Sequence, residues 1–497
     1  LLHQFQSPPG STILGFCHSV PSRRRGEIRA SMEASSGPRR SSAQEPDGPG
    51  DGADLISSLP DELLLLVLAR LPCAADAALT GVLSRRWLGL WAGLRQIVFR
   101  GVALPSLEAA LGRVATTPPA VSLLKIRVPI KQQRGPVPME HRTDSAGVPI
   151  NSLLRAAARL DPEKIDFRLP SGLIDRSLAV DLPRFHRATS IALDLSPITL
   201  AVPAGADFPA LETLSLARCS TDLDALLSCC PRLRTLRLST ARDITVNSPS
   251  LQELVVCCET SMTRHVDIVA PALKQLVISL TAVDHSISVL APMVEKVSWH
   301  CQYLGPRIVF GVWSLNKVQL QSAEIQGEPS SLCIYACAYS AFFHAQASHF
   351  KQEIEKHMVA AFSCLELHLI TTGHAFGALV FHLLGMNRIR TATRRLKVVL
   401  QRSALKEVCP PYCLCESNWR SQTISLDALE EVEFNGFSGA DHEFDLLELI
   451  LGCAPTLKRM IVKLSDETSA SNDGCAKIVN ILKACSSVEC DVYHSSG

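Results

Sequence analysis

Residues Leu211-Glu212-Thr213-Leu214-Ser215-Leu216 decide the fold of this chain, because their pattern apolar-x-x-apolar-x-apolar recurs along it. The recurrences begin at residues 233, 251, 273, 294 and 315, so the successive offsets are 22, 18, 22, 21 and 21 residues. A repeat of about 20 residues with this core predicts one short strand and one return per unit. Neighbouring units then stack their apolar side chains into a continuous core.

Prolines and weaker copies of the pattern extend this repeat. Five units are preceded, one or two residues before the strand core, by Pro209, Pro231, Pro249, Pro271 and Pro292. A proline at that place sets a turn into the strand. Weaker copies begin at Ile165, Ile191, Leu367, Leu396, Val432 and Met460. The period suits leucine-rich repeats, so we predict one curved α/β horseshoe from about residue 105 to the C-terminus, irregular because the asparagine ladder of regular repeats is absent.

One stretch inside the repeats has helical periodicity. Between Tyr335 and Phe362 we expect a helix on the outer side of the solenoid. Its apolar face would consist of Phe350, Ile354, Met358 and Ala361, and its polar side of Lys351, Glu353, Glu355 and Lys356.

A different segment precedes the repeats. Pro60 suits a first helical turn, and the acidic residues 61–62 suit the positive end of the helix dipole, so a helix should start near residue 60 and end by Pro72. Apolar residues at 63–68 occupy almost every direction around its axis. A second short helix is expected over 74–82, and a third, capped by Ser84, should carry Trp87, Leu90 and Trp91. Three short helices cannot bury this much apolar surface, so we predict a docking module.

These residues resemble the F-box family. The matching motifs are Leu59 to Leu64, Asp76-Ala77-Ala78 and Val82 to Trp91. In that family the module binds a Skp-type adaptor, which joins it to a cullin scaffold and a RING subunit, while the rest of the chain selects the substrate. The resemblance implies that the adaptor face and its supporting core consist of Leu59, Pro60, Leu63, Leu64, Leu68, Leu71, Val82, Leu83, Trp87 and Trp91. Leu88 departs from the pattern, since many relatives have a basic residue there. The alternative, an ordinary buried helical hairpin, is disfavoured by the length of the match.

The C-terminal segment resembles the FBD domain of many plant F-box proteins with leucine-rich repeats. The matching residues lie within 429–460, and the segment should fold as strand, glycine turn, amphipathic helix and strand, capped by a helix from Gly474 to Ala484. The fold class is therefore α/β. We expect a disordered segment at 1–53, a three-helix F-box at 54–100, the leucine-rich-repeat solenoid at 105–400 and an FBD-like domain at 415–490. Met32 is the expected native start, which would make residues 1–31 upstream translation or a gene-model artefact.

Composition excludes several classes of protein. The chain has 49 basic and 48 acidic residues, so no charge bias favours nucleic acid or an anionic membrane. Eighteen cysteines without any CxxC pair predict reduced, mostly buried thiols in cytosol or nucleus. The apolar run at 375–386 is too short to span a bilayer.

Two clusters could carry chemistry. Cys409, Cys413 and Cys415 could supply thiolates to zinc with His442 as a candidate fourth ligand, but we interpret them as structural thiols and predict neither metal nor cofactor. Asp441-His442-Glu443 precedes an apolar helix and is interpreted as caps and dipole partners. No P-loop, GxGxxG, HExxH or nucleophile elbow occurs, so no enzyme is predicted.

The predicted function is that of a substrate receptor in a Skp-cullin-F-box ubiquitin ligase, acting in the nucleus, the cytoplasm or both. The adaptor, and through it the cullin, would bind at the F-box, and an unknown protein substrate would bind the concave face of the solenoid. Two alternatives remain. One is a non-degradative interaction scaffold, and the other is a co-receptor whose concave face needs a small ligand to complete the substrate site.

Overall fold

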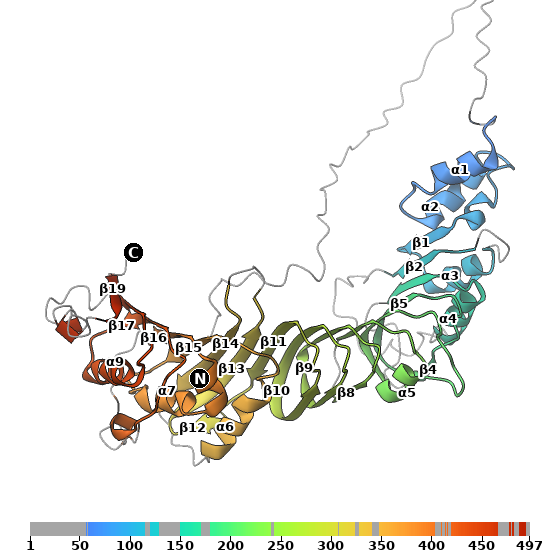
Figure 1. Cartoon of the computed structure of the whole chain (residues 1–497). Coiled ribbons are helices and arrows are strands. Elements are labelled where there is room, and N and C mark those ends of the chain that lie inside the picture. The colour runs from blue at the N-terminus through green and yellow to red at the C-terminus, as the bar shows by residue number, and fades with distance from the viewer. Residues whose placement is uncertain are drawn as a thin grey trace, which may run out of the picture. The chain divides into compact units, whose positions relative to one another are not determined.

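The computed structural model describes most of the chain from residue 56 onward (Figure 1). The described residues are 56, 58–114, 120–128, 150–169, 179–239, 243–306, 308–323, 328–339, 347–402, 409, 413, 415, 419–465, 477, 478, 480, 481 and 487–493. The predictions for residues 1–53, including a start at Met32, lie outside them.

Two α-helices open the described part, α1 (Asp61–Leu68) and α2 (Ala74–Leu79). Pro60 is the N-cap of α1 and two acidic residues lie in its first turn, which confirms the predicted start. The predicted third α-helix is wrong. The second predicted helix, over 74–82, consists of α2 followed by the 3-10 helix η1 (Thr80–Val82), whereas the segment predicted as the third forms turns and the 3-10 helix η2 (Leu90–Gly93). The reason is local: Gly89 has a φ of 88°, a left-handed conformation that an α-helix cannot contain.

Nineteen described strands join into one sheet. They are β1 (Gln96–Arg100), β2 (Leu123–Arg127), β3 (Lys164–Arg168), β4 (Ala179–Asp181), β5 (Ser190–Ala201), β6 (Thr213–Thr221), β7 (Thr235–Ser239), β8 (Asp243–Asn247), β9 (Glu253–Val269), β10 (Gln275–Leu290), β11 (Lys296–Tyr303), β12 (Val309–Phe310), β13 (Trp313–Gln321), β14 (Ser331–Ala338), β15 (Cys364–Ile370), β16 (Arg395–Gln401), β17 (Glu431–Phe437), β18 (Arg459–Leu464) and β19 (Glu489–Tyr493). Strand β1 lies within the range predicted for the F-box, yet it pairs with β2 and so begins the sheet.

The repeated apolar residues set the register of this sheet. Leu214 is paired with Leu236, Leu236 with Leu254, and Leu254 with Leu276, all in parallel strands. The same buried row continues through Ile97, Leu124, Ile165, Ile191 and Val297. A second row joins Leu332, Leu365, Leu396, Val432, Met460 and Cys490. The pattern therefore predicted the strands that contain its copies and most of their alignment. It did not predict β1, β2, β4, β8, β12, β14 or β19.

The sixth copy of the pattern differs from the prediction. The strand that contains Leu315, Val318 and Leu320 is β13, and it runs antiparallel to both of its long neighbours, β11 and β14. A tight hairpin reverses the chain: β12 pairs with β13 across a loop in which Gly311 has a φ of 58°. Glycine at the first position of a two-residue loop favours this turn.

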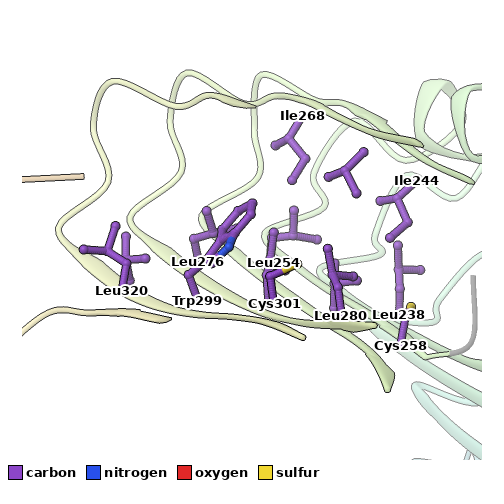
Figure 2. Packing of buried hydrophobic residues seen from close by; sticks show 14 of the residues in the cluster. Leu238, Ile244, Leu254, Cys258, Ile268, Leu276, Leu280, Trp299, Cys301 and Leu320 are labelled. Atoms are coloured by element: carbon purple, nitrogen blue, oxygen red, sulfur yellow. The ribbon is translucent and has the colours of Figure 1, made fainter. Parts of the chain in front are cut away.

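In the middle of the sheet the return segment of each repeat is itself a strand, which pairs with the return strand of the next repeat. Strand β8 pairs with the second half of β9, and that half pairs with the second half of β10. Figure 2 shows Ile244 and Ile268 of this second layer across the core from Leu254 and Leu276 of the first. A short helix, α5 (Leu223–Ser228), lies between β6 and β7.

Helices are found toward both ends of the sheet. They are α3 (Leu104–Leu111), α4 (Ile150–Arg159), α6 (Ala347–Lys356), α7 (Gly377–Leu384), α8 (Asn387–Ala392) and α9 (Asp441–Cys453), with the 3-10 helix η5 (Trp419–Ser421). On α6 the predicted apolar residues Phe350 and Ile354 are buried, but Tyr335 belongs to β14 and Ala361 is exposed.

Glu353 of α6 is also misplaced by the prediction, since it is only 2% exposed. Its Oε1 accepts a hydrogen bond from Tyr303 Oη at 2.8 Å, and its Oε2 one from Lys356 Nζ at 2.7 Å. Tyr303 Oη lies 2.5 Å from Nε2 of the buried His357, whose Nδ1 accepts from Trp299 Nε1 at 2.9 Å. Tyr303, 50 residues away in the sequence, and Lys356 of the same helix together provide hydrogen bonds to the buried carboxylate of Glu353.

The C-terminal segment folds as predicted up to residue 464, with β17, a turn, α9 and β18 in that order. Glu443 confirms its expected capping role, because its Oε2 accepts hydrogen bonds from the backbone amides of Ser438 and Ala440. Of the predicted capping helix, residues 477, 478, 480 and 481 are described and helical. That helix does not end the fold, since β19 follows and pairs with β18.

No described helix is long and apolar enough to cross a membrane. The cysteines in the described ranges are thiols, and several are buried. Burial and the nearby Asp194 raise the pKa of the Cys219 thiol to about 12.

Candidate functional site

Exposed apolar side chains concentrate in one short segment. Of fourteen large apolar residues that are exposed in the described structure, nine lie within residues 56–88. Monomeric proteins rarely leave so many together in contact with water. We call the α1–η1 members and Leu88 the docking surface: Leu63, Leu66, Val67, Leu71, Leu79, Val82, Leu83 and Leu88.

The docking surface has two parts that one arginine connects. On α1, Leu63 lies three and four residues before Leu66 and Val67, so these side chains share a helix face. The second part surrounds η1, where Val82 is 85% exposed and Leu83 is 66% exposed. Arg86, in the turn after η1, contacts the start of α1. Its Nη2 lies 2.8 Å from Asp61 Oδ1 and also donates a hydrogen bond to the carbonyl oxygen of Leu59.

A buried core supports this surface. Leu64, Leu68, Trp87 and Trp91 are all less than 8% exposed. Trp91 packs edge-on against Phe99 of β1, with ring centroids 6.4 Å apart. The core beneath the docking surface therefore packs against β1, the first strand of the sheet.

The ten residues predicted for adaptor binding separate into two groups. Pro60, Leu63, Leu71, Val82 and Leu83 are exposed, and Leu59 is half-buried. The four core residues named above can act only through packing. The sequence interpretation missed Leu66, Val67, Leu79 and Leu88 as surface members, although the run of apolar residues around the whole α1 axis already indicated that some must face outward.

The more exposed face of the strands carries ion pairs between residues of the same strand or of neighbouring strands. Asp166 of β3 lies 2.8 Å from Lys125 Nζ and 2.9 Å from Arg168 Nε. Burial alone would raise the pKa of Asp166, but hydrogen bonds from these two cations hold it below its usual range. Similar pairs join Arg237 to Glu253 and Lys463 to Glu433.

A pocket of about 310 Å³ opens on this face where β13 interrupts the parallel order. Tyr335 and His368 stack in it with ring centroids 4.3 Å apart, and Lys317 Nζ lies 4.3 Å above the Tyr335 ring. The lining is completed by His300, Gln302, Asn316, Ala336, Ile370 and Gln401. Aromatic faces beside a cation and amide groups suit a polar or anionic side chain of a partner.

A group of possible metal ligands lies apart from both surfaces. One ligand atom each from His374, Cys409, Cys413 and Cys415 lies within 4.8 Å of the others. His442, the fourth ligand considered from the sequence, is outside this group and forms a T-shaped pair with Phe376, with ring centroids 5.6 Å apart. His374 was missed because it precedes the cysteines by 35 residues or more.

Comparisons with known proteins agree with this architecture. Residues 150–299 match the family model described as the leucine-rich repeats of FBD-associated F-box protein At5g56370. The chain is 29% identical over 249 residues to MEIOTIC F-BOX protein MOF of Oryza sativa subsp. japonica, covering 46% of this chain and 52% of that protein.

Two Arabidopsis thaliana proteins are also similar. Putative F-box/FBD/LRR-repeat protein At1g66290 is 28% identical over 289 residues, which cover 54% of this chain and 59% of that protein. Putative FBD-associated F-box protein At5g50270 is 52% identical over 46 residues, 9% of this chain and 11% of that protein. The chain thus spans little more than half the length of the relatives that it matches most extensively.

Proposed function

From the confirmed resemblance of this chain to plant F-box proteins with leucine-rich repeats and an FBD-like segment, we propose that it is a substrate receptor of a Skp-cullin-F-box ubiquitin ligase. The docking surface would bind the Skp-type adaptor, which brings the cullin. A horseshoe-shaped solenoid would bind a protein substrate on its strand face. The ranges 54–100, 105–400 and 415–490 would be the F-box, the repeats and the FBD-like domain.

The observation that carries this proposal is the exposure of the docking surface. Fully burying one leucine or valine side chain stabilises a complex by about 1.5–3 kcal/mol. Eight exposed members therefore represent a large favourable free energy that is released only when a partner covers them. In a ligase this partner is the adaptor, and the chain itself would need no catalytic residue.

The mechanism is proximity. Holding a substrate beside the charged ubiquitin carrier raises the effective concentration of substrate lysines at an active site that belongs to other subunits. We propose that this occurs in the nucleus, the cytoplasm or both.

The experiment is a pull-down of the full chain with a purified Skp-type adaptor, comparing wild type with Val82→Asp/Leu83→Asp. Both side chains are more than 60% exposed, so the change leaves folding intact. Loss of two buried contacts and burial of two charges should weaken binding at least 100-fold.

The matched control is Leu290→Asp/Met293→Asp, which changes two residues of similar exposure in the repeats. It should bind the adaptor as wild type does. Equal binding by the Val82/Leu83 variant would refute the adaptor surface. Adaptor binding without recovery of the cullin from plant cells would favour the non-degradative scaffold.

The pocket beside Tyr335 favours a second step of the proposal, in which the substrate, or a ligand that assists it, is held there. Tyr335→Ala removes the ring that stacks on His368 and lies under Lys317. We expect this variant to retain the adaptor and to lose a protein that mass spectrometry finds with the wild type. Recovery of all the same proteins would place substrate binding elsewhere.

A further inference from the structure

Three cysteines and one histidine meet at the ends of two adjacent strands. His374 lies just after β15, in a turn where Thr372 and Gly373 have φ values of 42° and 79°. The cysteines belong to the connection between β16 and β17, which starts after residue 401 and ends before residue 431. Such long connections inside a compact repeat array usually have a specific structural or functional role.

The distances within this cluster suit a tetrahedral metal site. Cys409 Sγ lies 3.2 Å from His374 Nδ1 and 3.2 Å from Cys415 Sγ, while Cys413 Sγ lies 3.4 Å from His374 Nδ1. Bonds of 2.3 Å to sulfur and 2.0–2.1 Å to nitrogen imply S···S and S···N separations of about 3.8 and 3.6 Å in a tetrahedral zinc site. The three separations above are about 0.2–0.6 Å shorter than these values, and all four ligand atoms lie within 4.8 Å of one another.

The contacts of the sulfur atoms are those of thiols that share a site. The separation between Cys409 Sγ and Cys415 Sγ is far longer than the 2.05 Å or so of a disulfide. The backbone amide of Ala375 donates a hydrogen bond to Cys415 Sγ, an interaction that stabilises a thiolate.

A second contact holds the same connection in place. Trp419, at its end, is 1% exposed and packs its ring on Phe381 of α7, with centroids 5.9 Å apart. The fit is so close that a Cβ at Gly377 would lie 2.4 Å from the indole. The connection that contains the three cysteines is therefore packed, through Trp419, against α7, the helix that follows His374 in the sequence.

We propose that His374, Cys409, Cys413 and Cys415 bind one Zn²⁺ in a closed structural site. Four protein ligands of this kind leave no position for substrate, so the ion would be structural and not catalytic. The ion would link the connection between β16 and β17 to the turn after β15. It would thereby stabilise the part of the fold where the repeats meet the C-terminal segment. This inference does not depend on the proposed ligase role.

The test uses the full chain carrying a tag without histidine, purified from cells grown with added zinc. Elemental analysis should find about one zinc per chain. After replacement by Co²⁺, the visible absorption should show the intense bands of a tetrahedral thiolate site. Less than a quarter of an equivalent of zinc in folded protein, with no such bands, would overturn the proposal.

Variants identify the ligands. His374→Ala and Cys413→Ser should each lose most of the zinc, whereas the controls His442→Ala and Cys453→Ser should retain it. Zinc retained by His374→Ala but lost by His442→Ala would refute the assigned fourth ligand. If the ligand variants do not fold, chelation of the wild type is used, which should release zinc and expose three more thiols to alkylation. A Cys409–Cys415 disulfide in the mass spectrum of the non-reduced protein would also refute the site.

Discussion

Replacing Tyr303 by phenylalanine tests the buried hydrogen-bond chain between β11 and α6. Trp299 Nε1 can only donate, so Nδ1 of His357 must accept, and in the neutral ring the proton is on Nε2. That proton is donated to Tyr303 Oη, whose own proton goes to Glu353 Oε1. Each group in this series of hydrogen bonds therefore donates to the next, from Trp299 through His357 and Tyr303 to Glu353.

The magnitude follows from these contacts. Tyr303→Phe deletes one hydrogen bond to a neutral ring nitrogen and one to a carboxylate, while the edge-to-face contact with His357 is kept. Typical net values of about 1 kcal/mol for the first bond and about 2 kcal/mol for the second give a loss of about 3 kcal/mol. The residues around the deleted hydroxyl are less than 10% exposed, so water cannot easily replace it.

The assay is native-state hydrogen exchange read by mass spectrometry on peptides that cover α6. A loss of about 3 kcal/mol should accelerate exchange of its protected amides by roughly 100-fold. The matched control is Tyr335→Phe, whose hydroxyl has no hydrogen-bond partner among the described residues and whose loss should cost less than about 0.5 kcal/mol. Equal exchange in α6 for the two variants would refute the directional chain.

Three further predictions concern other parts of the structure. Leu64→Ala should destabilise α1 and α2 by about 2–5 kcal/mol, because Leu64 is fully buried, and limited proteolysis should cut this segment faster than in the exposed control Leu66→Ala. Gly377→Ala should cost about 1–3 kcal/mol through its clash with Trp419, and should change the tryptophan fluorescence of the folded protein. Asp166→Asn should lower stability by about 1 kcal/mol at pH 7. Since the folded-state pKa of Asp166 is depressed, its contribution is fully present above the unfolded-state pKa of about 3.9 and is lost as the pH falls through the lower folded-state pKa. Urea unfolding should therefore show the difference between the two proteins shrinking as the pH falls below about 4.

The repeated apolar pattern predicted the strands that contain its copies and most of their alignment, but not the direction of every strand. A buried residue at every second position is required in parallel and antiparallel strands alike, so Leu315, Val318 and Leu320 could not reveal that β13 is reversed. The informative feature was Gly311, between two short apolar runs. It was not recognised as a hairpin because the repeat period continued across it.

The sequence also did not predict which polar side chains are buried or which distant residues contact them. Glu353 has the spacing of a surface residue on α6, and only the three-dimensional position of Tyr303 explains its burial. In the same way, the sequence indicated the three cysteines as possible metal ligands but not His374. His374 lies near them because β15, which precedes it, pairs with β16, which precedes the cysteines. Short-range patterns cannot report partners that distant segments contribute.

The reversed strand β13 restricts how this protein can change its length during evolution. Whole units of about 20 residues can be duplicated or deleted within the parallel series β5–β11 or β14–β18, because each unit begins and ends in the same direction. Loss of residues 304–322 would instead leave 323–330 to join β11 to the parallel β14. In the shortened chain Leu332 would follow Val297 by only 16 residues, fewer than the 18 to 22 residues of the parallel units. The hairpin is therefore a fixed point, and we expect gene variants in this lineage to differ in repeat number on either side of it but to retain the hairpin itself.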